Sequence, residues 1–328
     1  MHVFIAGATG VLGRRLVAEL DSRGNEVIGL ARDDTGERVV REVGGTPVRG
    51  DLLAPETIQE AMPDDVDAVV HAATAIPTKT KTTAADWETT DRLRREGTET
   101  LTAAAVDAGA DRYVQQSVVW VARQPDGSEF DEDSEPHPDR TTEAAVDAER
   151  IAERAGAERD LDVAILRGGW FYAHDATHTR QIAARIANRR MPIVGGGLLG
   201  RRDATLSLCH VDDAASAFVA AVEGDATGRY HVVDDTPVTL ARFLQRLAAA
   251  LDAPEPMRVP GWLAKLLVGG DAVRLLTNPM PTNNDRFRSA FDWEPSYPSF
   301  KQGIDRLVEQ WKAEGTISRM DGEVEWRA

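Results

Sequence analysis

The sequence predicts an α/β protein built on a doubly wound parallel sheet, with a smaller, mainly helical C-terminal lobe. Three observations predict it. Short apolar runs alternate with helix-like segments from residue 2 to about 166, a glycine-rich loop follows the first apolar run, and the alternation stops after residue 167. The chain has 328 residues, 42% of them hydrophobic, which is enough for one large domain and a second lobe.

Six apolar runs have the length and composition of buried parallel strands. They are His2–Ala6, Glu26–Ala31, Thr46–Arg49, Ala68–His71, Tyr113–Ser117 and Val163–Leu166. The segments between them carry apolar residues at helical spacing. These expected helices are Leu12–Arg23, Pro55–Met62, Arg92–Ala108 and Thr142–Ala155. Gly24, Gly109 and Gly156 stand where helices should end, because glycine readily takes the left-handed conformation of a C-terminal cap.

The second lobe is expected wherever the strand–helix alternation is lost. A helix over Thr179–Arg190 follows the sixth strand, and a strand returns near Thr205. Beyond Val238 the chain turns to amphipathic helices and loops punctuated by proline. We therefore assign residues 1–166 and a return segment of about 205–235 to the sheet domain, and 167–204 and 236–328 to a substrate-binding lobe.

Composition narrows the classes of partner. With 38 basic and 54 acidic residues the formal net charge is −16, so attraction to nucleic acid or to an anionic membrane is disfavoured and a small-molecule partner is expected. No apolar run reaches the roughly 18 residues of a membrane-spanning helix. The single cysteine, Cys209, excludes an intrachain disulfide and fits a cytoplasmic protein. The many acidic residues and few lysines are typical of a salt-adapted protein.

The loop after the first strand has the pattern of a dinucleotide site. Gly7 allows a sharp turn, Gly10 allows backbone amides to approach a pyrophosphate, and Gly13 allows the next helix to pack on the sheet with its N-terminus toward the phosphates. The second strand ends in Arg32, with no acidic residue before Asp33. An arginine there can pair with a 2′-phosphate, so we expect NADP, with NAD as the alternative.

The spacing Gly-x-x-Gly-x-x-Gly resembles the extended short-chain dehydrogenase/reductase superfamily, whose members include NAD-dependent epimerases and dehydratases. Further segments match that family in order along the chain. They are Gly50-Asp51-Leu52, His71-Ala72-Ala73, Arg95-Glu96-Gly97-Thr98, Gln116-Ser117, Leu166-Arg167, His210-Val211-Asp212-Asp213-Ala214 and Phe291-Asp292-Trp293-Glu294-Pro295. The resemblance implies a Rossmann fold, a bound NAD(P) and a homodimer as one option for assembly.

The resemblance also implies which residues contact the cofactor. Asp51 would accept a hydrogen bond from the adenine amino group, and Leu52 would pack on the adenine ring. The loop and the end of the fourth strand would supply the remaining contacts: Thr9, Val11 and Leu12 beside the glycines, and Ala72, Ala73 and Thr74 under the ribose and nicotinamide.

Catalysis in this family depends on a Tyr-x-x-x-Lys pair, in which the tyrosine is the general acid/base. Alignment on Ala148-Glu149-Arg150 gives those positions to Thr141 and Ala145, so we expect this protein to lack the pair, as atypical members do. Ser117 stands where the family places a residue that hydrogen-bonds the substrate oxygen. Tyr172 is a candidate substitute acid/base and otherwise a pocket residue, and Trp120 and Trp170 are expected to line the substrate pocket.

Two functions are consistent with these residues. The first is an NAD(P)-dependent oxidoreductase or epimerase/dehydratase-like enzyme acting on a small carbonyl, hydroxyl or nucleotide-sugar-like substrate, with Ser117 and Tyr172 polarising the substrate oxygen. The second is a non-catalytic NAD(P)-binding sensor or assembly factor. No metal site is expected, because the pair His174 and His178 has no acidic or cysteine partner at ligand spacing.

Overall fold

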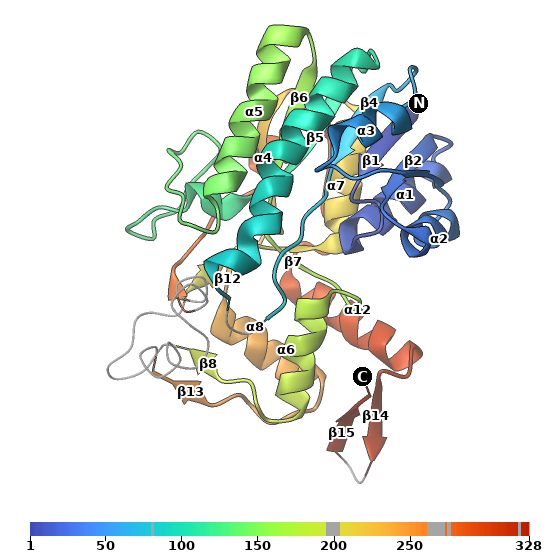
Figure 1. Cartoon of the computed structure of the whole chain (residues 1–328). Coiled ribbons are helices and arrows are strands. Elements are labelled where there is room, and N and C mark those ends of the chain that lie inside the picture. The colour runs from blue at the N-terminus through green and yellow to red at the C-terminus, as the bar shows by residue number, and fades with distance from the viewer. Residues whose placement is uncertain (80–81, 195–203, 261–272, 274–276, 321–322, 328) are drawn as a thin grey trace.

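The centre of the molecule is a seven-stranded sheet, all parallel, in the order β11-β6-β5-β4-β1-β2-β3 (Figure 1). The computed structural model describes residues 1–79, 82–194, 204–260, 273, 277–320 and 323–327. The sheet strands are β1 (His2–Ala6), β2 (Glu26–Ala31), β3 (Thr46–Arg49), β4 (Ala68–His71), β5 (Arg112–Val118), β6 (Asp162–Gly168) and β11 (Gly228–Val232). The strand order reverses between β1 and β4, so a crevice is expected at the carboxyl ends of these strands.

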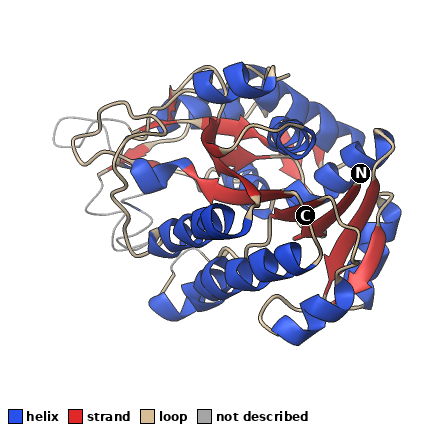
Figure 2. Ribbon diagram, turned by 90° about the horizontal axis from the view of Figure 1, so that it is seen from above, coloured by secondary structure: helices blue, strands red, loops and turns tan. Residues whose placement is uncertain are grey.

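Helices cover both faces of the sheet, as Figure 2 shows from above. On one face, α1 (Val11–Ser22) and α7 (Val211–Glu223) bury their apolar sides in a core with β1, β4 and β6. On the other, α3 (Pro55–Ala61), α4 (Ala84–Asp107) and α5 (Glu143–Arg159) form a second core. The predicted doubly wound α/β fold is therefore confirmed.

A further core lies outside the sheet. It joins η1 (Val119–Ala122) to β7 (Trp170–Tyr172), α6 (Thr177–Ala187), α8 (Leu240–Ala250) and α12 (Phe300–Ala313). Short elements complete this part: β8 (Ile193–Val194), β9 (Thr205–Leu206), β10 (Leu208–His210), β12 (Val238–Thr239), β13 (Arg258–Val259), α11 (Asp285–Phe291), β14 (Ile317–Met320) and β15 (Glu323–Trp326). The boundaries of the two lobes stay a prediction, although β11 does return to the sheet beside β6.

Three local expectations were wrong or incomplete. Helix α4 begins at Ala84 and not at Arg92, because Thr83 and Asp86 form a capping box that starts it earlier. Gly156 is not a cap, since α5 continues through it and ends with Asp160 in the left-handed conformation. The helix α2 (Asp34–Glu42) was not foreseen.

The glycines at the other two helix ends have positive φ, 83° at Gly24 and 74° at Gly109, as a C-terminal cap requires. Among the described residues, none of the helices is long and apolar enough to cross a membrane.

Candidate functional site

The glycine loop between β1 and α1 has a geometry that only glycine allows. Gly7 has φ of 95°, and a Cβ there would lie 2.6 Å from the carbonyl carbon of Ala72. A Cβ on Gly13 would lie 2.0 Å from the Gly7 oxygen, while the Gly10 amide donates to that same oxygen at 3.0 Å. No side chain caps the N-terminus of α1 at Gly10. The loop therefore forms a tight cradle at a helix N-terminus, which suits a pyrophosphate.

The other predicted contacts lie at the same edge of the sheet, because β1, β3 and β4 are parallel and all end there. Asp51 follows β3 and is half-buried, with its carboxylate accepting from the Leu53 amide at 3.0 Å, and Leu52 is buried beside it. Ala72 extends β4 by donating to the Ala6 oxygen at 2.8 Å. Thr74 is exposed. The fold thus brings the loop, Asp51, Leu52 and the segment 72–74 together.

Arg32 follows β2 and is a cation without a partner among the described residues. It is exposed and makes no hydrogen bond or ion pair with the part of the chain that the structure describes. Its acidic neighbours are already engaged: the Asp33 carboxylate caps α2 by accepting from the Gly36 amide at 2.8 Å, and Asp34 pairs with Arg49. Arg32 is thus available to an anionic ligand.

Ser117 belongs to a buried network that the sequence reasoning missed. Its hydroxyl lies 2.5 Å from Glu149 Oε1, and the same carboxylate is held by Arg167 through two hydrogen bonds of 2.9 and 2.7 Å. Both side chains of the ion pair are almost inaccessible, with 0% and 2% exposure. The Glu149 oxygens accept from both Ser117 and Arg167, so the Ser117 proton is directed at Glu149 and away from a substrate.

Thr141 and Ala145, which the alignment gives to the family's tyrosine and lysine, carry no acidic or basic side chain. Thr141 precedes α5, and its hydroxyl lies 2.7 Å from the Asp139 carboxylate. Ala145 is buried in α5. The chain has no tyrosine between Tyr113 and Tyr172 to replace the first of them. Arg94 of α4 reaches this region and donates to the Thr141 carbonyl at 3.0 Å.

An apolar pocket brings together the predicted residues Trp170 and Tyr172. Its other lining residues come from α6, β9, β10 and α8: His178, Thr179, Ile182, Leu206, Leu208, Leu240 and Phe243. Trp120 lies on η1 and packs against the same core. The Tyr172 hydroxyl faces α12, since a Cβ on Gly303 would lie 2.0 Å from it, and burial raises the pKa of Tyr172 well above its ordinary value. This position favours pocket lining over acid/base chemistry for Tyr172.

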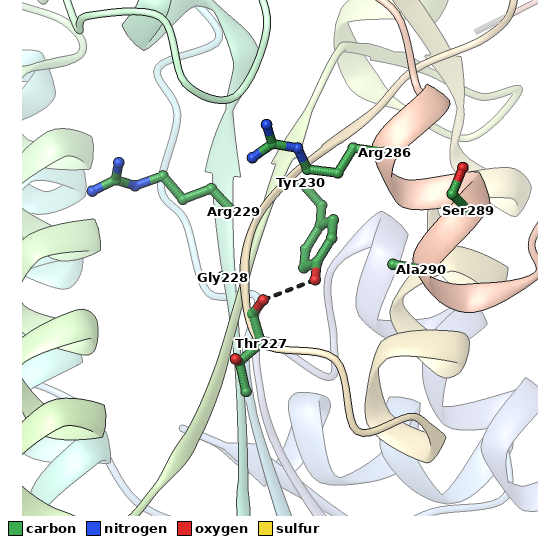
Figure 3. A pocket seen from close by; sticks show the side chains of 7 residues that line it. All are labelled: Thr227, Gly228, Arg229, Tyr230, Arg286, Ser289 and Ala290. Carbon is green, nitrogen blue, oxygen red and sulfur yellow. Dashed lines mark hydrogen bonds between the residues drawn. The ribbon is translucent and has the colours of Figure 1, made fainter.

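A second hollow lies at the outer edge of β11 and contains no predicted site residue (Figure 3). Its two arginines are neutralised: Arg229 pairs with Glu153 at 2.6 Å, and Arg286 pairs with Asp133. The Tyr230 hydroxyl donates to the Thr227 carbonyl at 2.8 Å. In the described part of the chain, no group of three or more His, Cys, Asp or Glu side chains could hold a metal ion.

Comparison with known proteins decides the family. The model of the NAD dependent epimerase/dehydratase family matches residues 3–233, which is more than half of the chain. The chain belongs to this family. It is therefore an NAD(P)-dependent oxidoreductase or epimerase-like protein, and the predicted resemblance to extended short-chain dehydrogenases is confirmed.

Two curated reductases are similar in sequence. The 3-diazoavenalumate denitrifying reductase of a Streptomyces species is 37% identical over 312 residues, 93% of this chain and 100% of that protein. The 4-hydroxy-2-methyl-3-oxo-4-farnesyl-3,4-dihydroquinoline-1-oxide ketoreductase of Stigmatella aurantiaca is 31% identical over 254 residues, 75% of this chain and 72% of that protein.

Among solved structures, the human epimerase family protein SDR39U1 (isoform 2) with NADPH has a TM-score of 0.79. It is 19% identical, and the match covers 94% of this chain and 99% of that one. This similarity shows the fold.

Proposed function

We propose that this protein is an NADPH-dependent reductase of electron-poor aromatic compounds, with arenediazonium ions as the substrate class. One observation carries the proposal: the Ser117 hydroxyl donates to the buried Glu149 carboxylate at 2.5 Å. Thr141 and Ala145 offer no replacement proton donor. A reduction that needs no proton from the protein fits such a site.

The chain's residues fit the cofactor. The cradle at Gly7 and Gly13, which a Cβ would fill, would hold the pyrophosphate against the N-terminus of α1. Asp51 and Leu52 would contact the adenine, and Ala72, Ala73 and Thr74 the ribose and nicotinamide. The exposed, unpaired Arg32 would bind the 2′-phosphate, which favours NADP over NAD.

The substrate class follows from whether the reduction needs a proton from the protein. Reduction of a ketone adds a hydride to carbon and a proton to oxygen, so it needs an acid. When bound, NADPH supplies a hydride, and a diazonium carbon that takes it releases dinitrogen with the C–N bonding pair, so that no proton enters the balance. The name of the Streptomyces relative, a denitrifying reductase of a diazo compound, supports this class.

The pocket residues would hold the aromatic ring after their side chains move apart, since the free volume between them is about 10 Å³, room for one water molecule. Trp170, Tyr172 and Phe243 present apolar and aromatic surface, and no Asp, Glu, Lys or Arg lines the pocket within the described residues. Such a lining suits an aryl group better than a sugar diphosphate. Ser117, whose hydroxyl donates its hydrogen bond to Glu149, would present oxygen lone pairs toward a cationic or electron-poor group.

A substrate panel tests the proposal. Purified protein is mixed with NADPH and either benzenediazonium, benzaldehyde, acetophenone or a nucleotide sugar, and NADPH oxidation is followed by absorbance. We expect enzyme-dependent oxidation with the diazonium ion and little with the carbonyl compounds. Faster reduction of a ketone would show that a proton donor exists. No oxidation with any compound, together with tight NADPH binding, would favour the cofactor-binding sensor instead.

A further inference from the structure

Asp175, in the segment that follows β7, is bound to two neighbouring arginines of α1. Its carboxylate accepts from Arg14 Nη2 at 2.5 Å through Oδ2 and from Arg15 Nη2 at 2.9 Å through Oδ1. Burial alone would raise the pKa of Asp175, but the bonds to Arg15 and Arg14 lower it, so the carboxylate is ionised at neutral pH. One carboxylate therefore holds two cations of the helix that follows the glycine loop.

Arg14 in turn holds a peptide group of the glycine loop. Its Nη1 donates to the Thr9 carbonyl at 2.9 Å. The peptide bond between Thr9 and Gly10 is planar and trans, so its carbonyl and its N–H point in opposite directions. That N–H donates to the Gly7 oxygen at 3.0 Å. The same peptide plane is therefore held at both ends, by Arg14 on one side and by Gly7 on the other.

The amides that open α1 follow directly after this peptide. Residues 11–13 form the start of the helix, and no side chain caps it. The first amides of a helix have no acceptor within the helix and suit a phosphate. Only the two backbone dihedrals of Gly10 separate the held peptide from the first of these amides. The contact between Arg14 and Thr9 therefore helps to orient the donors expected for the pyrophosphate.

The smaller lobe holds the same segment from the other side. Nε2 of His174 lies 3.0 Å from Glu314 Oε1, and Nε1 of the buried Trp311 donates to the His174 carbonyl at 2.7 Å. Trp311 belongs to α12, and Glu314 caps its C-terminal end. Figure 1 shows α12 in the smaller lobe, below the sheet domain that contains α1. Asp175 thus joins the glycine loop to a well-packed part of the lobe.

We propose that Asp175 is a positioning residue for the dinucleotide, which acts through Arg14 to fix the Thr9 peptide of the glycine loop. The inference rests on the part of the proposed function that assigns NADPH to this loop, and it holds whatever the substrate is. Charge alone predicts the opposite effect. A dinucleotide is an anion, so a further carboxylate beside the start of α1 repels it.

The variant Asp175→Ala separates the two effects by the sign of the change in affinity for NADPH, measured by calorimetric titration. If the charge of Asp175 were all that mattered, its removal would tighten binding. Loss of the bond that holds Arg14 should instead weaken binding. We expect a dissociation constant about 5- to 30-fold higher, the scale of one partly exposed charge-assisted hydrogen bond. Equal or tighter binding of NADPH by Asp175→Ala would overturn the inference.

Asp212→Ala is the matched control. The Asp212 carboxylate pairs with Arg15 from the side of α7, and within the described residues it makes no ion pair with Arg14. The control removes the same charge beside the same helix and leaves the bond from Arg14 to Thr9 in place. We expect NADPH affinity to stay the same or to rise slightly. Equal weakening in Asp212→Ala and Asp175→Ala would show a general loss of structure and would also overturn the inference.

Asp175→Asn keeps the test valid if Asp175→Ala fails to fold. The amide retains one carbonyl oxygen, which can serve fewer of the arginine donors than the carboxylate does. We expect a loss of NADPH affinity smaller than that of Asp175→Ala, in a variant whose thermal melt without ligand shows it folded at the titration temperature. Asp175→Asn that binds NADPH as tightly as wild type would contradict the positioning role.

This inference and the proposed function can fail separately. Wild type that binds NADPH, depends on Asp175 for that affinity and reduces no diazonium ion would remove the proposed substrate class and leave the role of Asp175. Reduction of benzenediazonium by wild type, together with unchanged NADPH affinity in Asp175→Ala, would leave the reductase and remove the role of Asp175.

Discussion

Replacement of Arg32 by alanine is expected to lower the affinity for NADPH while that for NADH stays the same. The guanidinium is exposed and unpaired at the end of β2, so the variant loses no interaction within the described protein. A charge-assisted bond to a phosphate is worth about 1.5 to 3 kcal/mol, and exposure to solvent reduces that range to about 1 to 2 kcal/mol. The predicted loss is therefore about 5- to 30-fold in the dissociation constant for NADPH.

Calorimetric titration of both nucleotides at two ionic strengths measures this directly. The loss should shrink at high salt, because an exposed pair is screened. Arg41→Ala is the control, since Arg41 is also exposed but is paired with Glu37 at 3.1 Å on α2, and it should leave both affinities unchanged. Equal weakening of NADH and NADPH in Arg32→Ala, or tighter binding of NADH by wild type, would refute the assignment of Arg32 to the 2′-phosphate.

Four further outcomes are expected. Gly13→Ala should lower kcat/KM by about 100-fold, the scale of a roughly 1 Å misplacement, because its Cβ would lie 2.0 Å from the Gly7 oxygen; steady-state rates of NADPH oxidation check it, and an unchanged kcat/KM would contradict it. Glu149→Gln should lower the free energy of unfolding by about 3 to 5 kcal/mol because Arg167 loses its counterion, whereas a denaturant titration showing less than about 1 kcal/mol would argue against a buried pair. Burial raises the pKa of Asp234 to about 8, so the folded state keeps a proton that the unfolded state releases near pH 4. The free energy of unfolding of wild type should therefore fall by about 1 kcal/mol from pH 7 to pH 8. The variant Asp234→Asn should remove most of that fall. The melting temperature should rise from low to molar KCl, because the net charge is −16 and salt screens the repulsion between like charges. A melting temperature that does not rise with salt would argue against salt adaptation.

Local pattern was enough to predict the sheet and the cofactor loop. The predicted apolar runs coincide with strands β1 to β6 to within two residues at each end, because an apolar run between polar segments has few alternatives to a buried strand. The glycine spacing at Gly7, Gly10 and Gly13 likewise depends only on residues close in sequence. Gly156 was misread because a glycine in a closely packed place, where an added Cβ would lie 2.9 Å from the Leu161 oxygen, has the same sequence signal as a cap.

The polar networks of the site could not be predicted in the same way. Ser117 and Glu149 are 32 residues apart, and Arg94 and Thr141 are 47 apart, so only the packing of α5 against β5 and α4 brings each pair together. Glu149 and Arg167 were both in segments that match the family, yet nothing local indicates that one neutralises the other.

The fate of the cofactor's hydrogen tests the central claim most directly. Protein, benzenediazonium and NADPH carrying deuterium at the transferred C4 position are combined in ordinary water, and the product is analysed by mass spectrometry. Hydride transfer without a protein proton donor predicts benzene with one deuterium atom, formed at a rate that depends little on pH between 6 and 8. Benzene without deuterium, or a rate that follows the titration of a single acid, would contradict it.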